Sequence, residues 1–362
     1  MSDPIGRWAA IGPYYAMFPL EFPFKVIEKY SRPGDLVIDP FAGRASSIYA
    51  AATKGRHGLG IEINPLGWVY AQTKLKSASQ NLVEKKLLDI FERANDYKIQ
   101  AQYMSEFFHW CFSDGVLSFL LSARDNLSWK KNKVDRTLMG LLLIYLHGKL
   151  GQALSNQMRH AKSMSGSYSV NWWKSRNMLP PEIDPYGFML TRIKWRYAKG
   201  LPKITDSDVK LGDSTLILEG EADKFRKKIG KQCSLFFTSP PYYGITHYHK
   251  DQWIRLWLLG GKENAMWSSE RHKGRFDSKA EYKELLDNIF GTAEQIMAKE
   301  STIYIRTDTR EFTYSATRKL LKEHFPKWKL RTIQAPVSGT TQTHMLGNKS
   351  SKPGEIDIIL TR

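Results

Sequence analysis

The sequence contains 362 residues, and 42% of them are hydrophobic. This is enough apolar material to fill the core of one large α/β domain with an insertion, or of two domains. The chain carries 54 Lys and Arg residues against 36 Asp and Glu residues, a formal net charge of +18. A basic surplus of this size exceeds what solubility requires and favours a polyanionic partner, with nucleic acid as the first candidate.

The N-terminus, the apolar runs and the two cysteines exclude further classes of protein. The start has no apolar signal core, and the longest apolar stretch, 138–146, is too short to span a bilayer, so we expect a soluble cytoplasmic protein without a membrane partner. Cys111 and Cys233 lie in apolar contexts without metal-ligand spacing, so we expect core thiols and no metal. Neither follows a proline, which argues against covalent methylation at C5 of cytosine.

The first regular unit is a strand, a glycine-containing turn and a helix. A proline-rich loop precedes a short helix that starts near Glu21, and a buried strand follows at 36–38. This strand runs into the turn 39–45, and the small residues of 48–52 form the next helix. The pattern predicts the first unit of a doubly wound nucleotide-binding sheet.

A second strand, 58–61, ends in the acidic residue Glu62. A carboxylate at the carboxyl end of the second strand can accept hydrogen bonds from both vicinal hydroxyls of a ribose. We therefore expect Glu62 to bind the ribose of a nucleoside-containing cofactor.

Residues 81–200 form a predicted helical insertion. Amphipathic helices continue to about residue 158, with breaks near 113–115 and 129–133, and the stretch 138–146 must be buried. Basic, amide, hydroxyl and aromatic residues then alternate over 155–176 without a core period, which is typical of phosphate and base contacts. The predicted DNA contacts are Arg159, Lys162, Trp172, Lys174 and Arg176. The alternatives are a solvated basic face and, for Trp172 and Trp173, packing of the insertion onto the sheet.

The sheet resumes after the insertion. We expect strands at 209–211, 235–238, 301–306 and 355–360, the last as a closing edge strand, and helices at 216–230 and 282–297. An aromatic helix over 251–259 is expected to line a target pocket. The segment 262–279 reads as a basic loop whose Arg271 and Lys273 are further predicted DNA contacts.

The strand 235–238 leads into Ser239, Pro240, Pro241 and Tyr242. Two adjacent prolines fix φ near about −65° twice, so the Ser239 hydroxyl, the Pro240 carbonyl and the Tyr242 ring project from one stiff corner. Two acceptors and a stacking ring suit a planar exocyclic amino group, which offers two N–H donors and a flat face.

Thr238 to Tyr242 resembles the catalytic motif of the S-adenosylmethionine-dependent amino-methyltransferases of DNA, which modify N4 of cytosine or N6 of adenine. The turn from Asp39 to Gly43, followed by Glu62, resembles motifs I and II of that family. Residues 14–34 resemble the motif that closes over the methionine end of the cofactor, and Asp213 lies in a segment similar to motif III.

The resemblance implies a doubly wound, Rossmann-like α/β methyltransferase sheet with a mainly helical insertion. Residues 1–80 would be its cofactor-binding half and 201–362 its catalytic half. It implies S-adenosylmethionine as cofactor and direct methyl transfer to a flipped base, with Ser239 and the Pro240 carbonyl accepting the amino N–H bonds and Tyr242 stacking. The cofactor residues that it implies are Tyr15, Phe18, Asp39, Phe41, Ala42, Gly43, Glu62, Ile63, Asp213 and Ser214.

The chain departs from the family at Arg44 and Ala45, where the usual continuation is Gly-Ser-Gly-Thr-Thr. Because Ala45 replaces a glycine, we expect a turn that needs no positive φ at this position. A serine at position 239 resembles the pattern of the N4-cytosine enzymes. The resemblance therefore favours methylation of cytosine at N4 in duplex DNA, as part of a restriction–modification system.

Several alternatives stay open: N6-adenine methylation, methylation of an exocyclic amine in RNA, and DNA binding without catalysis. A cognate restriction endonuclease would be a partner, and the protein would be a monomer or a homodimer.

Overall fold

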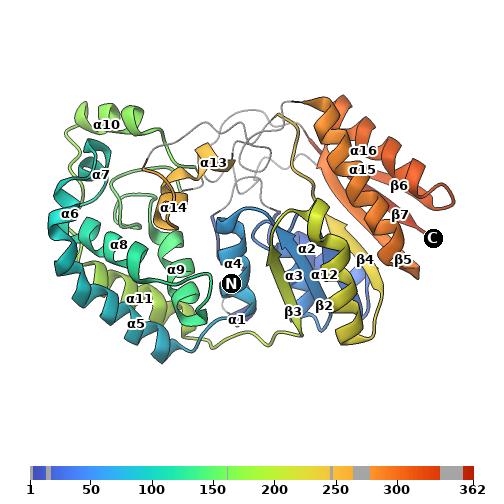
Figure 1. Ribbon diagram of the computed structural model, residues 1–362, viewed down its shortest axis with the longest axis horizontal. Coiled ribbons are helices and arrows are strands. Elements are labelled where there is room, and N and C mark those ends of the chain that lie inside the picture. Colours follow the sequence, from blue (N-terminus) through green and yellow to red (C-terminus); the bar gives the residue numbers. More distant parts are fainter. Residues whose placement is uncertain (1–2, 14–17, 161, 245–247, 264–277, 335–353) are drawn as a thin grey trace. The chain divides into compact units, whose positions relative to one another are not determined.

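The computed structural model describes residues 3–13, 18–160, 162–244, 248–263, 278–334 and 354–362 (Figure 1). The chain forms two compact units. We call them the helical unit, made of 1–15, 72–202 and 247–268, and the sheet unit, made of 16–71, 203–246 and 269–362. Each unit is therefore assembled from three separate stretches of the chain.

The sheet unit contains a seven-stranded sheet in the order β3-β2-β1-β4-β5-β7-β6. The strands are β1 (Leu36–Asp39), β2 (His57–Glu62), β3 (Ser207–Leu211), β4 (Cys233–Thr238), β5 (Met297–Asp308), β6 (Lys329–Gln334) and β7 (Glu355–Thr361). Neighbouring strands are parallel from β3 to β5, whereas β7 runs antiparallel to both β5 and β6. The strand order reverses between β1 and β4, and doubly wound sheets bind ligands beyond the carboxyl ends of the strands at such a point.

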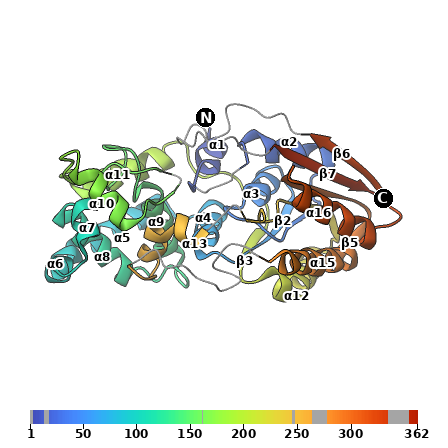
Figure 2. The same ribbon diagram turned by 90° about the horizontal axis from the view of Figure 1, so that it is seen from above.

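Helices cover both faces of this sheet. Leu36 and Ile38 point into a core that includes α12 (Ser214–Ile229), α15 (Lys279–Ile296) and α16 (Glu311–His324). Val37 points to the other face, against α2 (Glu21–Tyr30) and α3 (Ser46–Thr53). In Figure 2, α12 and α15 lie on one side of the strands and α2 on the other. The fold is thus the doubly wound α/β sheet that the sequence predicts.

The helical unit has its own apolar core. Its helices are α1 (Pro4–Ala9), α5 (Gln80–Glu92), η1 (Arg93–Tyr97), α6 (Lys98–Gln102), α7 (Glu106–Cys111), α8 (Asp114–Asn126), α9 (Lys133–Tyr145), α10 (Gly166–Lys174), α11 (Pro185–Tyr197), α13 (Tyr248–Asp251) and α14 (Trp253–Leu258). The boundary between the units falls in α4 (Pro65–Leu75). The stretch 138–146 is buried except for the half-buried Tyr145, and both cysteines are buried free thiols, as expected. No helix in the described parts of the chain is both long and apolar enough to cross a bilayer.

Three sequence expectations about the fold are wrong. The strand β7 is not an edge strand, because β6 pairs with its outer side. The predicted helical pattern to about 158 stops earlier, since α9 ends at Tyr145. Instead of one helix that lines a pocket, 251–259 contains the end of α13 and the whole of α14, and Trp253 and Trp257 are buried in the core of the helical unit, against Phe108.

Candidate active site

The candidate site lies where three parallel strands of the sheet unit end. Asp39 ends β1, Glu62 ends β2 and Thr238 ends β4. Because β1 lies between β2 and β4, these carboxyl ends are neighbours at one edge of the sheet. The residues that follow them form the turn 39–45 and the tip 239–242, which we call the cofactor turn and the catalytic tip.

Asp39 joins the cofactor turn to β4, which we call the catalytic strand after its predicted role. Its Oδ1 accepts hydrogen bonds from the backbone N–H of Phe41 at 3.0 Å and from the Thr238 hydroxyl at 2.6 Å. Its Oδ2 accepts one from the Ser47 hydroxyl at the start of α3. Burial raises the pKa of Asp39 to about 6, against the opposing effect of these bonds. The side chain is 2% exposed, so Asp39 stabilises the structure of the site from a buried position.

The expectation that the cofactor turn needs no positive φ at Ala45 is wrong. Its φ is +58° and its ψ is +44°, so the turn does use the left-handed region at this alanine. The Ala45 N–H donates to the Ala42 carbonyl at 2.6 Å, and its own carbonyl accepts from Tyr49 at 2.9 Å, which starts α3. A left-handed alanine costs about 1–2 kcal/mol, which these bonds and the complete burial of the residue offset. Arg44 is also buried, and burial lowers the pKa of its guanidinium to about 10.

Glu62 closes over the cofactor turn. Its Oε2 accepts from the Gly43 N–H at 2.6 Å and its Oε1 from the Asn64 N–H at 2.8 Å. Burial raises the pKa of Glu62 to about 7, although both backbone bonds oppose the rise. Gly67 of α4 makes this packing possible, because a Cβ there would lie 2.9 Å from Cγ of Glu62 and 2.8 Å from the Gly43 carbonyl oxygen.

The loop after β3 completes the carboxyl edge. The Asp213 side chain caps α12 by accepting from the Thr215 N–H at 2.9 Å. The Ser214 hydroxyl donates to the Pro40 carbonyl, and the Gly212 N–H donates to the Glu62 carbonyl at 3.0 Å. The loops after β1, β2 and β3 are therefore hydrogen-bonded to one another.

The residues at this edge fit an adenosine group. A carboxylate oxygen has two lone pairs, so each oxygen of Glu62 can accept a ribose hydroxyl in addition to its backbone N–H. Ile63 beside it is 37% exposed, an apolar surface on which a purine can lie. Phe41 is half-buried and Ala42 is buried. Phe18 stacks on Phe237 of β4 with ring centroids 5.7 Å apart, whereas Tyr15 lies outside the described residues.

The catalytic tip presents its polar groups at the end of β4. Ser239, Pro241 and Tyr242 are half-buried and Pro240 is buried. The Tyr242 hydroxyl donates to Oε1 of Glu355 at 3.4 Å, and it also hydrogen-bonds with Ser239. Burial and the nearby Glu355 raise the pKa of Tyr242 well above its usual value, against the opposing bond with Ser239, so the phenol stays protonated at neutral pH.

Next to the catalytic tip, β5 and β7 carry a network of charged side chains that the sequence does not predict. Arg306 binds Asp357 with two bonds, Nε to Oδ1 at 2.7 Å and one Nη to Oδ2 at 2.8 Å, and both side chains are buried. Its other Nη donates to Oε2 of Glu355 at 3.3 Å. The Tyr304 hydroxyl donates to Asp357 at 2.6 Å, and the guanidinium lies 3.3 Å from the ring centre of Phe22. Only the β5–β7 register, which pairs Arg306 with Asp357, reveals this network.

The predicted DNA contacts belong to the helical unit. Arg159 and Arg176 are exposed, and the guanidinium of Arg176 lies 4.7 Å from the ring centre of the half-buried Trp172. Lys174 is exposed and ion-paired with Glu106, and Lys162 is half-buried and ion-paired with Asp251 at 3.1 Å. The neighbouring Trp173 is fully buried within the unit. Arg271 and Lys273 lie outside the described residues.

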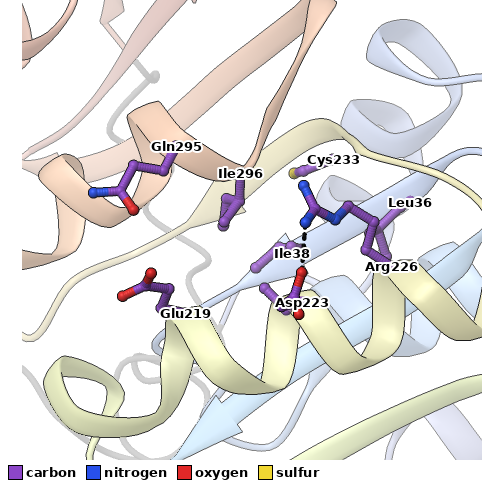
Figure 3. A pocket seen from close by; sticks show the side chains of 9 residues that line it. Leu36, Ile38, Glu219, Asp223, Arg226, Cys233, Gln295 and Ile296 are labelled. Atoms are coloured by element: carbon purple, nitrogen blue, oxygen red, sulfur yellow. Dashed lines mark hydrogen bonds and ion pairs between the residues drawn. The ribbon is translucent and has the colours of Figure 1, made fainter.

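One hollow of the sheet unit lies elsewhere (Figure 3). Its volume is about 140 Å³, and residues of α12, α15 and β1 and the first residue of β4 form its walls. The lining residues are Leu36, Ile38, Glu219, Ala222, Asp223, Arg226, Cys233, Gln295 and Ile296. None of them is a predicted site residue, so this hollow is separate from the candidate site.

Comparison with known proteins identifies the N-terminal part of the chain. A family model described as DNA methylase, for N6 and N4 methyltransferases, matches residues 5–66. The chain is 26% identical over 87 residues to the type II methyltransferase M.MjaII of Methanocaldococcus jannaschii, and 41% identical over 49 residues to the type II methyltransferase M.MthZI of Methanothermobacter thermautotrophicus. Residues 5–66 are thus similar to the N6 and N4 DNA methylase family. The match of residues 5–66 to this family supports S-adenosylmethionine as cofactor.

The matches cover a limited share of the relatives. They span 24% of this chain and 16% of M.MjaII, and 14% of both this chain and M.MthZI. Among solved structures, a ribosomal RNA methyltransferase, aviRa from Streptomyces viridochromogenes, is 9% identical, with a TM-score of 0.33 over 99% of this chain and 91% of that one. A methyltransferase from Streptococcus mutans is 9% identical, with a TM-score of 0.34 over 95% of this chain and 49% of that one.

Proposed function

We propose that this protein is a DNA methyltransferase that moves a methyl group from S-adenosylmethionine to N4 of cytosine in duplex DNA. The observation that carries the proposal is the bond between Thr238 and Asp39. It fixes the end of the catalytic strand to the cofactor turn, so the residue after Thr238 starts beside the turn that would hold the cofactor. A serine, two prolines and a tyrosine follow at this place.

The mechanism assigns a separate task to each group. When bound, the cofactor supplies an electrophilic methyl group on a sulfonium centre. The amino lone pair of the target base is delocalised into the ring and must localise before it can attack this methyl group. Ser239 and the Pro240 carbonyl favour localisation by accepting the two N–H bonds, and Tyr242 stacks on the flipped base. Pro240 and Pro241 hold these groups in place, because proline restricts φ.

The cofactor contacts extend this proposal along the carboxyl edge. Glu62 would bind the ribose hydroxyls, and Ile63 and Phe41 would contact the adenine ring. The buried Asp39, Ala42 and Ser214 and the half-buried Gly43 would shape the turn, with Asp213 near the adenosine. Phe18 and Tyr15 would close over the methionine end.

The choice of cytosine rests on Ser239, since a serine in the first position of the motif resembles the N4-cytosine enzymes. The helical unit would recognise the target DNA. Exposed Arg159 and Arg176 would neutralise phosphates, and Trp172, held under Arg176, would contact sugar or base. Both curated relatives are named type II methyltransferases, which supports a role in restriction–modification with a nuclease that acts on the same site.

Radiolabelled cofactor tests the proposal. The protein is incubated with tritiated S-adenosylmethionine and unmethylated duplex DNA, and the DNA is digested to nucleosides and separated by chromatography. We expect label in N4-methyl-2′-deoxycytidine, lost in Ser239→Ala and kept in Ser234→Ala, which changes a half-buried serine of β4. Label in N6-methyladenine would overturn the base assignment, and absence of label from DNA would overturn the proposed activity.

A further inference from the structure

The methyl transfer proposed above leaves a proton to be removed. As the N–C bond forms, the S–C bond breaks and its electron pair goes to sulfur, so the attacking nitrogen becomes positively charged. It returns to neutrality only when one of its N–H protons leaves. A hydrogen-bonded acceptor near this nitrogen accelerates such a step by about 10²–10⁴ fold when it is well placed.

A chain of hydroxyl groups leads away from the predicted position of the nitrogen. Ser239 hydrogen-bonds with the Tyr242 hydroxyl, and this bond lowers the pKa of the phenol. The phenol has a single proton, which it donates to Glu355, so in its bond with Ser239 it accepts and Ser239 donates. The Tyr242 hydroxyl in turn donates to Oε1 of Glu355 at 3.4 Å. This distance is long for an O–H···O bond, as is common at catalytic sites before the substrate binds.

We propose that Ser239, Tyr242 and Glu355 form a proton relay that removes the proton from the target amino group, with Glu355 as the final acceptor. The N–H proton passes to the Ser239 oxygen, the serine proton to the Tyr242 oxygen, and the phenol proton to the Glu355 carboxylate. After the transfer both hydroxyls are neutral again, and the direction of their hydrogen bonds is reversed. The inference rests on the proposed function and adds to it the acceptor of the proton.

The surroundings of Glu355 suit the end of such a relay. Its side chain is 38% exposed, so the carboxyl group can release the proton to water. Arg306 of β5 holds Oε2 at 3.3 Å, which leaves Oε1 directed to the tyrosine. Among the described residues, charged groups near Tyr242 and Glu355 also include Asp308 of β5, which pairs with Arg310, and Asp357 of β7, which binds Arg306 with two hydrogen bonds.

The relay predicts a pH profile for the transfer step. Single-turnover rate constants are measured for the protein with S-adenosylmethionine and duplex DNA between about pH 4 and 8, a range that includes the loss of the proton from an ordinary glutamate carboxyl group. We expect the wild-type rate to fall as the pH falls, because a protonated Glu355 cannot accept. Glu355→Gln should be slower by about tenfold or more at neutral pH and should keep only the pH dependence that comes from Asp39 and Glu62, whose pKa values are about 6 and 7, with unchanged affinity for S-adenosylmethionine.

Two more variants separate the relay from a structural role. Glu323→Gln removes an exposed glutamate of α16 and should match the wild type. Tyr242→Phe keeps the ring and removes the hydroxyl, so it should slow transfer as much as Glu355→Gln, and the double variant should be no slower than either single one. The fold should persist in Glu355→Gln, because Asp357 still holds Arg306 with two bonds.

The outcomes distinguish the two proposals. If the wild type transfers methyl groups to DNA and Glu355→Gln has the same rate and pH profile, the relay is wrong and the proposed activity stands. If the wild type transfers no methyl group to DNA, the proposed function fails and the relay fails with it.

Discussion

Removal of the Thr238 hydroxyl should destabilise the protein by an amount that depends on pH. Thr238 and Asp39 are both buried, and the bond between them is 2.6 Å long. Thr238→Val keeps the shape and removes the donor. Above about pH 6 the partner is a carboxylate, and such a bond contributes about 1.5–3 kcal/mol, whereas a bond to the neutral acid contributes about 0.5–1.5 kcal/mol.

The direction in which the stability changes with pH follows from the pKa of Asp39. Burial raises it to about 6 from its ordinary value of 3.8, so Asp39 stabilises the fold fully below its unfolded pKa, and this contribution is lost as the pH rises through about 6. Loss of the Thr238 donor raises the folded pKa further, and each unit corresponds to about 1.4 kcal/mol. The expected cost of Thr238→Val is therefore about 1 kcal/mol at pH 5 and about 2–3 kcal/mol at pH 8.

Urea unfolding at the two pH values measures this difference. Thr317→Val is the control, because Thr317 is also fully buried but donates to a neutral carbonyl, that of Thr313, at 2.7 Å. Its cost should be the same at both pH values. An equal cost of Thr238→Val at pH 5 and pH 8 would refute the coupling between the cofactor turn and the catalytic strand.

Three further variants test other parts of the structure. Ala45→Gly should change the unfolding free energy by less than about 1 kcal/mol, since relief of left-handed strain offsets the lost methyl group, whereas Ala50→Gly inside α3 should cost about 2 kcal/mol. Asp357→Asn should cost about 3–5 kcal/mol in urea unfolding, because it leaves a buried guanidinium without its counter-charge. Arg176→Gln should reduce the slope of log K for DNA against log salt by about 1, more than Lys174→Gln, whose lysine is already ion-paired.

The sequence predicts the parallel strands of the sheet well. Strands β1, β2 and β4 are short apolar runs bounded by glycine, proline or polar residues, and in a doubly wound fold such runs are buried on both faces. The positions of Asp39, Glu62 and Ser239 at strand ends follow from this pattern, because the carboxyl ends of parallel strands share one edge.

Other features depend on contacts that the sequence does not encode locally. The strand β6 was missed because most of its residues are exposed and it lacks an apolar run. The left-handed Ala45 contradicts the preference of alanine, and buried tertiary bonds hold it there. Glu355 was assigned only to a strand, since its contact with Tyr242 spans 113 positions and depends on the pairing of β5 with β7.

The helical unit consists of three separate stretches, which limits how the DNA specificity that we propose for it could be changed. Arg255 of α14 is buried and donates to the carbonyls of Leu143 and His160, so the segment after the catalytic tip holds the segment that precedes the predicted DNA contacts. A graft of 81–200 from a relative would arrive without this arginine and without residues 1–15. Exchange of recognition between such enzymes would therefore require all three stretches to be transferred together.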